Sequence, residues 1–128
     1  VSGEYTQEQK DCVNVIREVF RKTRDALKPG ECGKTLDPIG AKIYEKHGWT
    51  QYIVCPFVHG LGLMEAERPF FGPNGTDVLQ PGSIVSIDIS IFGHPKFNGV
   101  RVETGYVITE TGYEPLSPEM DARLEKEL

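Results

Sequence analysis

The stretch IVSIDISIF at residues 84–92 alternates apolar with polar side chains, which is typical of a strand with one face in the core. Its polar positions are Ser86, Asp88 and Ser90, which share one face of the expected strand. Residues 100–108, VRVETGYVI, alternate in the same manner and would form a second strand. Turn formers, GHPKFN, separate the two stretches. We therefore expect two antiparallel strands joined by a short connection.

The expected pairing brings two carboxylates together. Phe92 and Gly99 flank the connection and would pair across it. Antiparallel counting from that pair places Asp88 directly opposite Glu103, with the two carboxylates roughly 5 Å apart and repelling each other. An unpaired carboxylate among isoleucines also costs several kcal/mol. A cation would remove both penalties, and His59 in VHGLGL is a natural further ligand. The sequence predicts a metal site made of His59, Asp88 and Glu103.

Length and composition limit the remaining possibilities. The chain has 128 residues and 38% hydrophobic content, enough for a single domain over residues 1–128. A net charge of -5 without a Lys/Arg cluster argues against a nucleic-acid partner. No apolar run approaches the roughly 20 residues that span a membrane, and no signal-peptide pattern opens the chain. Cys12, Cys32 and Cys55 lack CxxC spacing, which favours reduced thiols and a cytoplasmic location. Because the chain does not begin with Met, we expect a piece of a longer protein.

Helical periodicity precedes the two strands. An amphipathic helix is predicted over residues 6–27, where Thr6 and Gln9 have capping-box spacing. A second helix is expected from Thr35 or Asp37 to Lys46, followed by a strand at 52–58 that delivers His59 at its end. The remaining expected elements are a loop at 60–77, a short strand at 113–116 and a frayed helix at 118–128. The predicted fold class is α+β, with two helices packed on one face of an antiparallel sheet and polar residues facing a cleft.

The order of these motifs resembles the pita-bread metallohydrolases, the family of methionine aminopeptidase, aminopeptidase P, prolidase and creatinase. Nearly the whole chain is covered. The motifs are the first helix with its stop at residues 28–30, HGLG at 59–62, a Pro-Gly turn with an acidic strand at 79–88, and RVE at 101–103. The resemblance implies a pita-bread fold of which residues 1–128 are the C-terminal portion. The half that carries two upstream Asp ligands would be absent.

The resemblance also implies roles for individual residues. His59, Asp88 and Glu103 would be metal ligands for divalent Mn, Co or Zn, with two ions in the intact parent. Asp88 or Glu103 would also act catalytically, by taking a proton from the attacking water. Arg101 would steady the carboxylates from outside the ligand set, and Glu67, which matches the flanking pattern, would assist there. Glu65 and Glu67 fit a solvated loop edge better than a catalytic position.

Three positions depart from the family pattern. Asp88 stands where members usually have Glu, so the charge is kept while the oxygens retract by one methylene. Ala66 stands where family peptidases have a second His, seven residues after the ligand His. Cys55 stands where aminopeptidase P-like members have a His, four residues before it. The imidazoles that position a peptide carbonyl are therefore missing.

The resulting functional hypothesis is a metal-dependent hydrolase of a C–N bond, in an Xaa-Pro peptide or a small amide, with the isolated piece inactive. Its partners would be that small peptide or amide, and the resemblance allows a homodimer of the intact parent. One alternative is a metal-free, creatinase-like hydrolase in which His59 is the acid/base. The other alternative is a degenerate pita-bread module that binds without catalysing.

Overall fold

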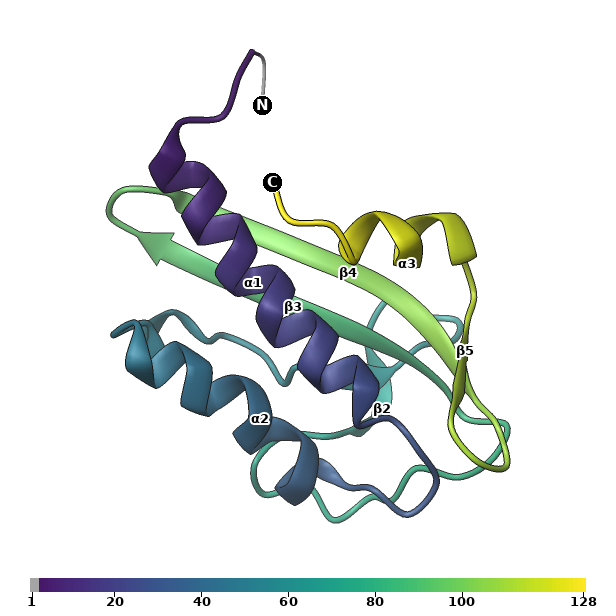
Figure 1. Ribbon diagram of the computed structural model, residues 1–128. Coiled ribbons are helices and arrows are strands. Elements are labelled where there is room, and N and C mark those ends of the chain that lie inside the picture. The colour runs from purple at the N-terminus through teal and green to yellow at the C-terminus, as the bar shows by residue number, and fades with distance from the viewer. Residues whose placement is uncertain (1–2) are drawn as a thin grey trace.

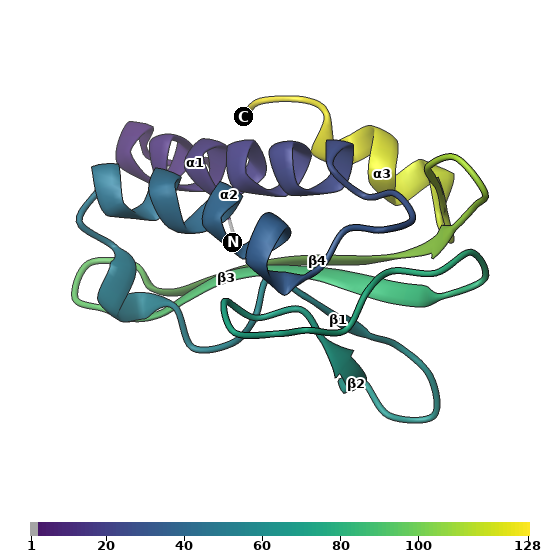
Figure 2. The same ribbon diagram turned by 90° about the horizontal axis from the view of Figure 1, so that it is seen from below.

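The computed structural model describes residues 3–128, in which three α-helices cover one face of a five-stranded antiparallel sheet (Figure 1). The sheet order is β2-β1-β3-β4-β5. Figure 2 shows the sheet edge-on, with all three helices on the same side of β3 and β4. The elements are α1 (Gln7–Asp25), α2 (Gly33–Lys46), a 3-10 helix (Thr50–Tyr52), β1 (Val58–Gly60), β2 (Glu67–Phe70), β3 (Ile84–His94), β4 (Asn98–Ile108), β5 (Tyr113–Pro115) and α3 (Pro118–Leu124). The predicted α+β class is confirmed.

The first helix begins where its capping residues predict. The Gln9 backbone N–H donates to Thr6 Oγ1 at 3.3 Å, and the Thr6 N–H donates to Gln9 Oε1 at 2.9 Å. One face of α1 then enters the core through Ile16, Val19 and Phe20, each fully buried. Burying that face stabilises the helix far more than intrinsic propensity does.

The β3–β4 hairpin forms the centre of the sheet. Its register pairs Phe92 with Gly99 and Asp88 with Glu103, as predicted from the alternation. Ile87 lies on the helix-covered face and is fully buried; its core-facing neighbours on β3 share that burial. Since successive side chains alternate between faces, Asp88 must lie on the face away from the helices.

Two predicted elements were wrong in their bounds. The predicted strand at residues 52–58 is a 3-10 turn followed by irregular chain, and β1 is limited to Val58–Gly60 with His59 at its middle position. The second helix begins at Gly33 rather than at Thr35 or Asp37. Gly33 allows this start because a Cβ there would lie 2.0 Å from the backbone oxygen of Gly72.

The predicted loop at residues 60–77 contains a strand, β2. β2 is an edge strand, so Pro69, which has no N–H donor, is tolerated within it. β2 pairs with β1 at His59 and Gly60, so it fixes the strand that carries the histidine. Over residues 3–128, no helix combines the length and the apolar character needed to cross a bilayer.

Candidate metal centre

His59, Asp88 and Glu103 come from three neighbouring strands, β1, β3 and β4. The pairing of His59 with Ser86 and of Asp88 with Glu103 brings the three side chains to the sheet face opposite the helices. One ligand atom from each lies within 4.8 Å of the other two. His59 is 3% exposed and Asp88 5% exposed, while the Glu103 side chain keeps 23% of its surface. The predicted residues therefore form one cluster that opens to solvent at Glu103.

The His59 ring is held by its neighbour along the strand. Its Nδ1 lies 2.9 Å from the carbonyl oxygen of Gly60. Since a carbonyl can only accept, Nδ1 carries the proton and donates it there. The other ring nitrogen, Nε2, lies 3.5 Å from Glu103 Oε1. In the neutral ring Nε2 presents a lone pair to the cluster, which is the state that binds a metal ion.

The two oxygens of Asp88 have different surroundings. Oδ2 lies 3.1 Å from Arg101 Nη2 and 3.6 Å from the Cys55 sulfur. Oδ1 is buried and has no hydrogen-bond partner among the described residues. Burial raises the pKa of Asp88, Arg101 opposes that rise, and the nearby Glu103 carboxylate adds to it. The free oxygen of a buried carboxylate is unfavourable alone and is a suitable ligand for a cation.

Arg101 links the carboxylates of the cluster. Its Nη2 bonds Oε2 of Glu103 and also lies 2.7 Å from Glu65 Oε1. Partial burial lowers the pKa of Arg101, but Asp88 and Glu103 outweigh this and raise it overall. Arg101 thus lies against both carboxylates, and its role in steadying metal ligands stays a prediction. Glu65, expected on a solvated loop edge, is its further partner and remains largely exposed.

Glu67 contacts its own loop rather than the carboxylate cluster. Its Oε2 accepts from the Met64 N–H at 3.2 Å, and its carboxylate packs against Gly62. Glu67 therefore stabilises the loop between β1 and β2, whereas Glu65 reaches the cluster through Arg101. The sequence offered no periodic signal that could separate the two glutamates, because both lie outside a regular element or at its first residue.

Ser86 is a site residue that the roles drawn from the sequence did not include. Its hydroxyl donates to Glu103 Oε1 at 2.8 Å. The alternation of β3 had placed Ser86 on the same face as Asp88, so the signal was present. Ser86 donates to Oε1 of Glu103 and Arg101 donates to Oε2. Each oxygen of this carboxylate therefore accepts from one donor and keeps one free lone pair.

The donor set fits a divalent cation. An imidazole nitrogen with carboxylate oxygens suits Zn, Mn or Co, and three protein donors leave coordination positions open for other ligands. The unpartnered Oδ1 of Asp88 is the observation that favours this fit. His59, Asp88 and Glu103 could therefore hold an ion between β1, β3 and β4.

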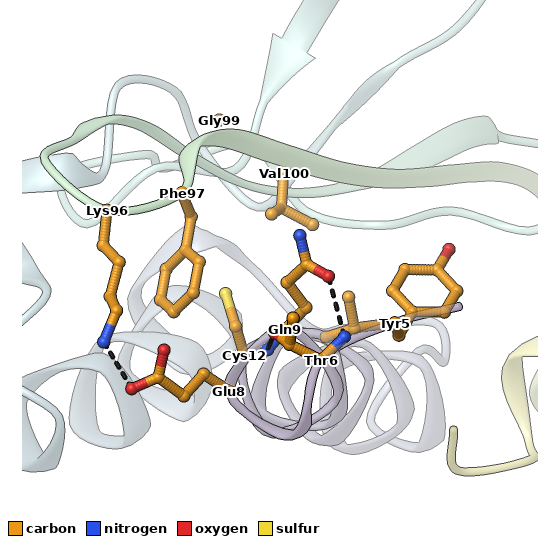
Figure 3. Close-up of a pocket in the computed structure, with 10 residues that line it drawn as sticks. Tyr5, Thr6, Glu8, Gln9, Cys12, Lys96, Phe97, Gly99 and Val100 are labelled. Atoms are coloured by element: carbon orange, nitrogen blue, oxygen red, sulfur yellow. Dashed lines mark hydrogen bonds and ion pairs between the residues drawn. The ribbon is translucent and has the colours of Figure 1, made fainter. Parts of the chain in front are cut away.

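A separate pocket of about 390 Å³ lies between the start of α1 and the β3–β4 hairpin tip. Figure 3 shows Cys12 and Phe97 directed toward its interior and the Glu8–Lys96 ion pair at one side. Val100 lines it from the helix-covered side of β4, whereas Arg101 faces the carboxylate cluster. The pocket is thus on the other face of the sheet from His59 and its partners.

The chain is similar to known proteins along most of its length. The Xaa-Pro dipeptidase of Pyrococcus furiosus is 32% identical over 117 residues, which are 91% of this chain and 33% of that protein. The prolidase structure from Pyrococcus furiosus has a TM-score of 0.82 at 32% identity, covering 91% of this chain and 34% of that chain. The prolidase from Pyrococcus horikoshii has a TM-score of 0.81 at 30% identity, covering 100% and 34%. The chain spans about a third of the length of these relatives.

The matched region extends through nearly all of the elements described above. The model of metallopeptidase family M24 matches residues 1–110, which include α1, α2 and all three strands of the cluster. The prolidase structures share the arrangement of helices on an antiparallel sheet, so the predicted pita-bread fold class is confirmed. The chain therefore belongs to metallopeptidase family M24.

Proposed function

We propose that this chain supplies His59, Asp88 and Glu103 to the metal centre of a hydrolase that cleaves a C–N bond, in an Xaa-Pro peptide or a small amide. The observation that carries the proposal is that three ligand atoms, one from each residue, lie within 4.8 Å of one another. One of the carboxylates, Asp88, also has a buried oxygen to which no group donates. The relatives named Xaa-Pro dipeptidase and prolidase support the peptide as substrate class.

The residues of the chain would divide the chemistry between them. A bound divalent ion supplies Lewis acidity and lowers the pKa of water. His59 holds its Nε2 lone pair toward the cluster because Nδ1 is committed to Gly60. Glu103, the most exposed of the three, can accept a proton from the attacking water and return it to the leaving nitrogen. Arg101 limits the repulsion between the two carboxylates while this proton moves.

A centre with two ions needs more donors than these strands supply. We propose that two further carboxylates, carried by a part of the protein outside this chain, complete the site for two Mn, Co or Zn ions. On this proposal residues 1–128 are the C-terminal portion of a larger catalytic domain. The chain by itself would then bind divalent ions weakly and hydrolyse little, because three donors leave the ion open to competing water.

Calorimetric titration with Mn²⁺ tests the ligand assignment. The Glu103→Gln substitution removes a charge from the cluster, and we expect it to weaken Mn²⁺ binding at least tenfold. Glu114→Gln, on β5, removes an equal charge away from the cluster and serves as the matched control. Equal affinities of the two variants would contradict the assignment. Tight binding of two ions by the chain alone would contradict the proposed missing carboxylates.

One observation favours a second candidate, a metal-free hydrolase. Arg101 already places a positive charge against both Asp88 and Glu103, so the cluster is partly neutralised without an ion. His59 would then serve as the acid/base through Nε2. Activity of the larger enzyme that survives complete removal of metal would favour this candidate. A protein with neither metal binding nor activity would instead fit a binding module.

A further inference from the structure

We propose that Cys55 is a positioning residue that, together with Arg101, directs Oδ1 of Asp88 toward the bound ion. The inference deepens the proposed metal centre and rests on it. It assigns a role to a thiol that lies outside the ligand set, in the irregular segment just before β1. The thiol and the guanidinium occupy the same oxygen of Asp88, and the other oxygen is left free.

A short chain of polar contacts runs along β3 through Cys55. The Cys55 sulfur lies 3.6 Å from Asp88 Oδ2 and 3.7 Å from the hydroxyl oxygen of Ser90. An ionised carboxylate only accepts, so the thiol must donate to Asp88. The Ser90 hydroxyl is then free to donate to the sulfur. Cys55 is half-buried and Ser90 is 3% exposed, so neighbouring protein groups shield these contacts from competing water.

The contacts determine which oxygen of Asp88 is available. A half-turn of the carboxylate would exchange Oδ1 and Oδ2, leaving the two donors in place and changing nothing. A smaller rotation, however, would pull Oδ2 away from both the Arg101 and Cys55 donors. Two donors on one oxygen therefore define the carboxylate plane, and the buried oxygen without a donor has a fixed direction. A fixed direction matters for metal binding because the aspartate side chain is short and its oxygens can reach few positions.

Cys55 acts through Asp88 rather than as a ligand. The cluster of possible ligand atoms found in the described part of the chain contains His59, Asp88 and Glu103 without the Cys55 sulfur. The thiol is placed behind the carboxylate oxygen that already receives Arg101. Groups that orient a ligand in this way typically contribute 10- to 100-fold to metal affinity.

The test is the affinity of the protein for Co²⁺, measured by calorimetry, for Cys55→Ala and Cys55→Ser. We expect about a tenfold loss for Cys55→Ala and an affinity within about threefold of the parent for Cys55→Ser, because a hydroxyl can replace the donor. Cys32→Ala, at the start of α2, is the matched control and should bind as the parent does. Thermal unfolding of each variant shows whether it is folded, and Cys55→Ser keeps the test valid if Cys55→Ala is not. Equal affinities of all three variants would overturn the proposal.

A variant cycle separates this inference from the proposed function. If Asp88→Ala and Glu103→Gln bind Co²⁺ as the parent does, the metal centre itself is wrong. If both weaken binding, Cys55→Ala should have no further effect in the Asp88→Ala background. A Cys55→Ala loss that persists there would show that the thiol does not act through Asp88. A sulfur-to-cobalt charge-transfer band that disappears in Cys55→Ser would show direct ligation and overturn the positioning role.

Discussion

Nε2 of His59 lies 3.5 Å from Oε1 of Glu103, and in the neutral ring both atoms present lone pairs. Two acceptors at this separation repel each other unless a proton or a cation lies between them. The arrangement is therefore poised for a positive charge, and its stability should depend on whether one is bound. Any species that binds only the folded state raises stability in proportion to the logarithm of its concentration.

Asp88→Asn should reverse its effect on stability when metal is added. Burial is the main cause of the raised pKa of Asp88, so its charged form is disfavoured in the fold. Without metal, removing that charge should stabilise the protein by about 1 kcal/mol, or roughly 3 °C in Tm. With saturating Mn²⁺ the parent should become the more stable protein, because the variant loses a charged ligand. Calorimetric melting in EDTA and in Mn²⁺ measures both; a lower Tm for the variant in EDTA would contradict the argument.

Arg101→Gln should destabilise the metal-free protein and have less effect once Mn²⁺ is bound. The guanidinium offsets the repulsion between Asp88 and Glu103, a task that a bound ion would share. Glu65→Gln is the control, since its contact with Arg101 is largely exposed and such pairs contribute at most about 1 kcal/mol. Urea unfolding with and without Mn²⁺ gives the two differences, and an unchanged effect of Arg101→Gln would count against the shared role.

Gly60→Ala should destabilise the protein and disturb the cluster together. A Cβ at Gly60 would lie 2.6 Å from the backbone oxygen of Arg68, so β1 and β2 would have to separate. We expect a loss of about 1–3 kcal/mol in urea unfolding and weaker Co²⁺ binding, because His59 is the adjacent residue. Gly112→Ala, where residues 3–128 place no atom within 4 Å of the added Cβ, should change neither quantity. Equal stabilities of the two variants would refute the close approach.

Cys12 should resist alkylation in the folded protein. It is 3% exposed, and burial raises the pKa of its thiol to about 11, so little thiolate is present at pH 8. Cys32, which is half-buried at the start of α2, should react first. Peptide mass mapping after timed exposure to iodoacetamide distinguishes them. Rapid modification of Cys12 under native conditions would mean that the pocket beside it opens readily.

The hairpin could be predicted from sequence because two independent patterns agree on it. Alternation along residues 84–92 defines the faces, and the turn formers between Phe92 and Gly99 define the register. Together they placed Asp88 opposite Glu103 without any knowledge of the rest of the chain. The capping box at Thr6 was predicted equally well, since its hydrogen bonds are local.

The surroundings of the cluster depend on contacts that no local pattern encodes. The apolar run at residues 52–58 predicts a strand, but Tyr52 and Ile53 instead pack, partly buried, against the core at the 3-10 helix, and Val54 is exposed. The different contacts of Glu65 and Glu67 depend on how the loop between β1 and β2 folds. Glu65 contacts Arg101, whereas Glu67 accepts from the Met64 N–H. The metal roles of His59, Asp88 and Glu103 remain predictions.

The position of Arg101 on the same hairpin as both carboxylates has a consequence for folding. Asp88, Arg101 and Glu103 are brought together by neighbouring strands, whereas His59 joins from a strand more distant in the sequence. Contacts that are close in sequence close smaller loops and form at lower entropic cost. The hairpin therefore contains the positive charge of Arg101, which offsets the two carboxylates as the strands pair. Strand pairing then requires no ion from solution.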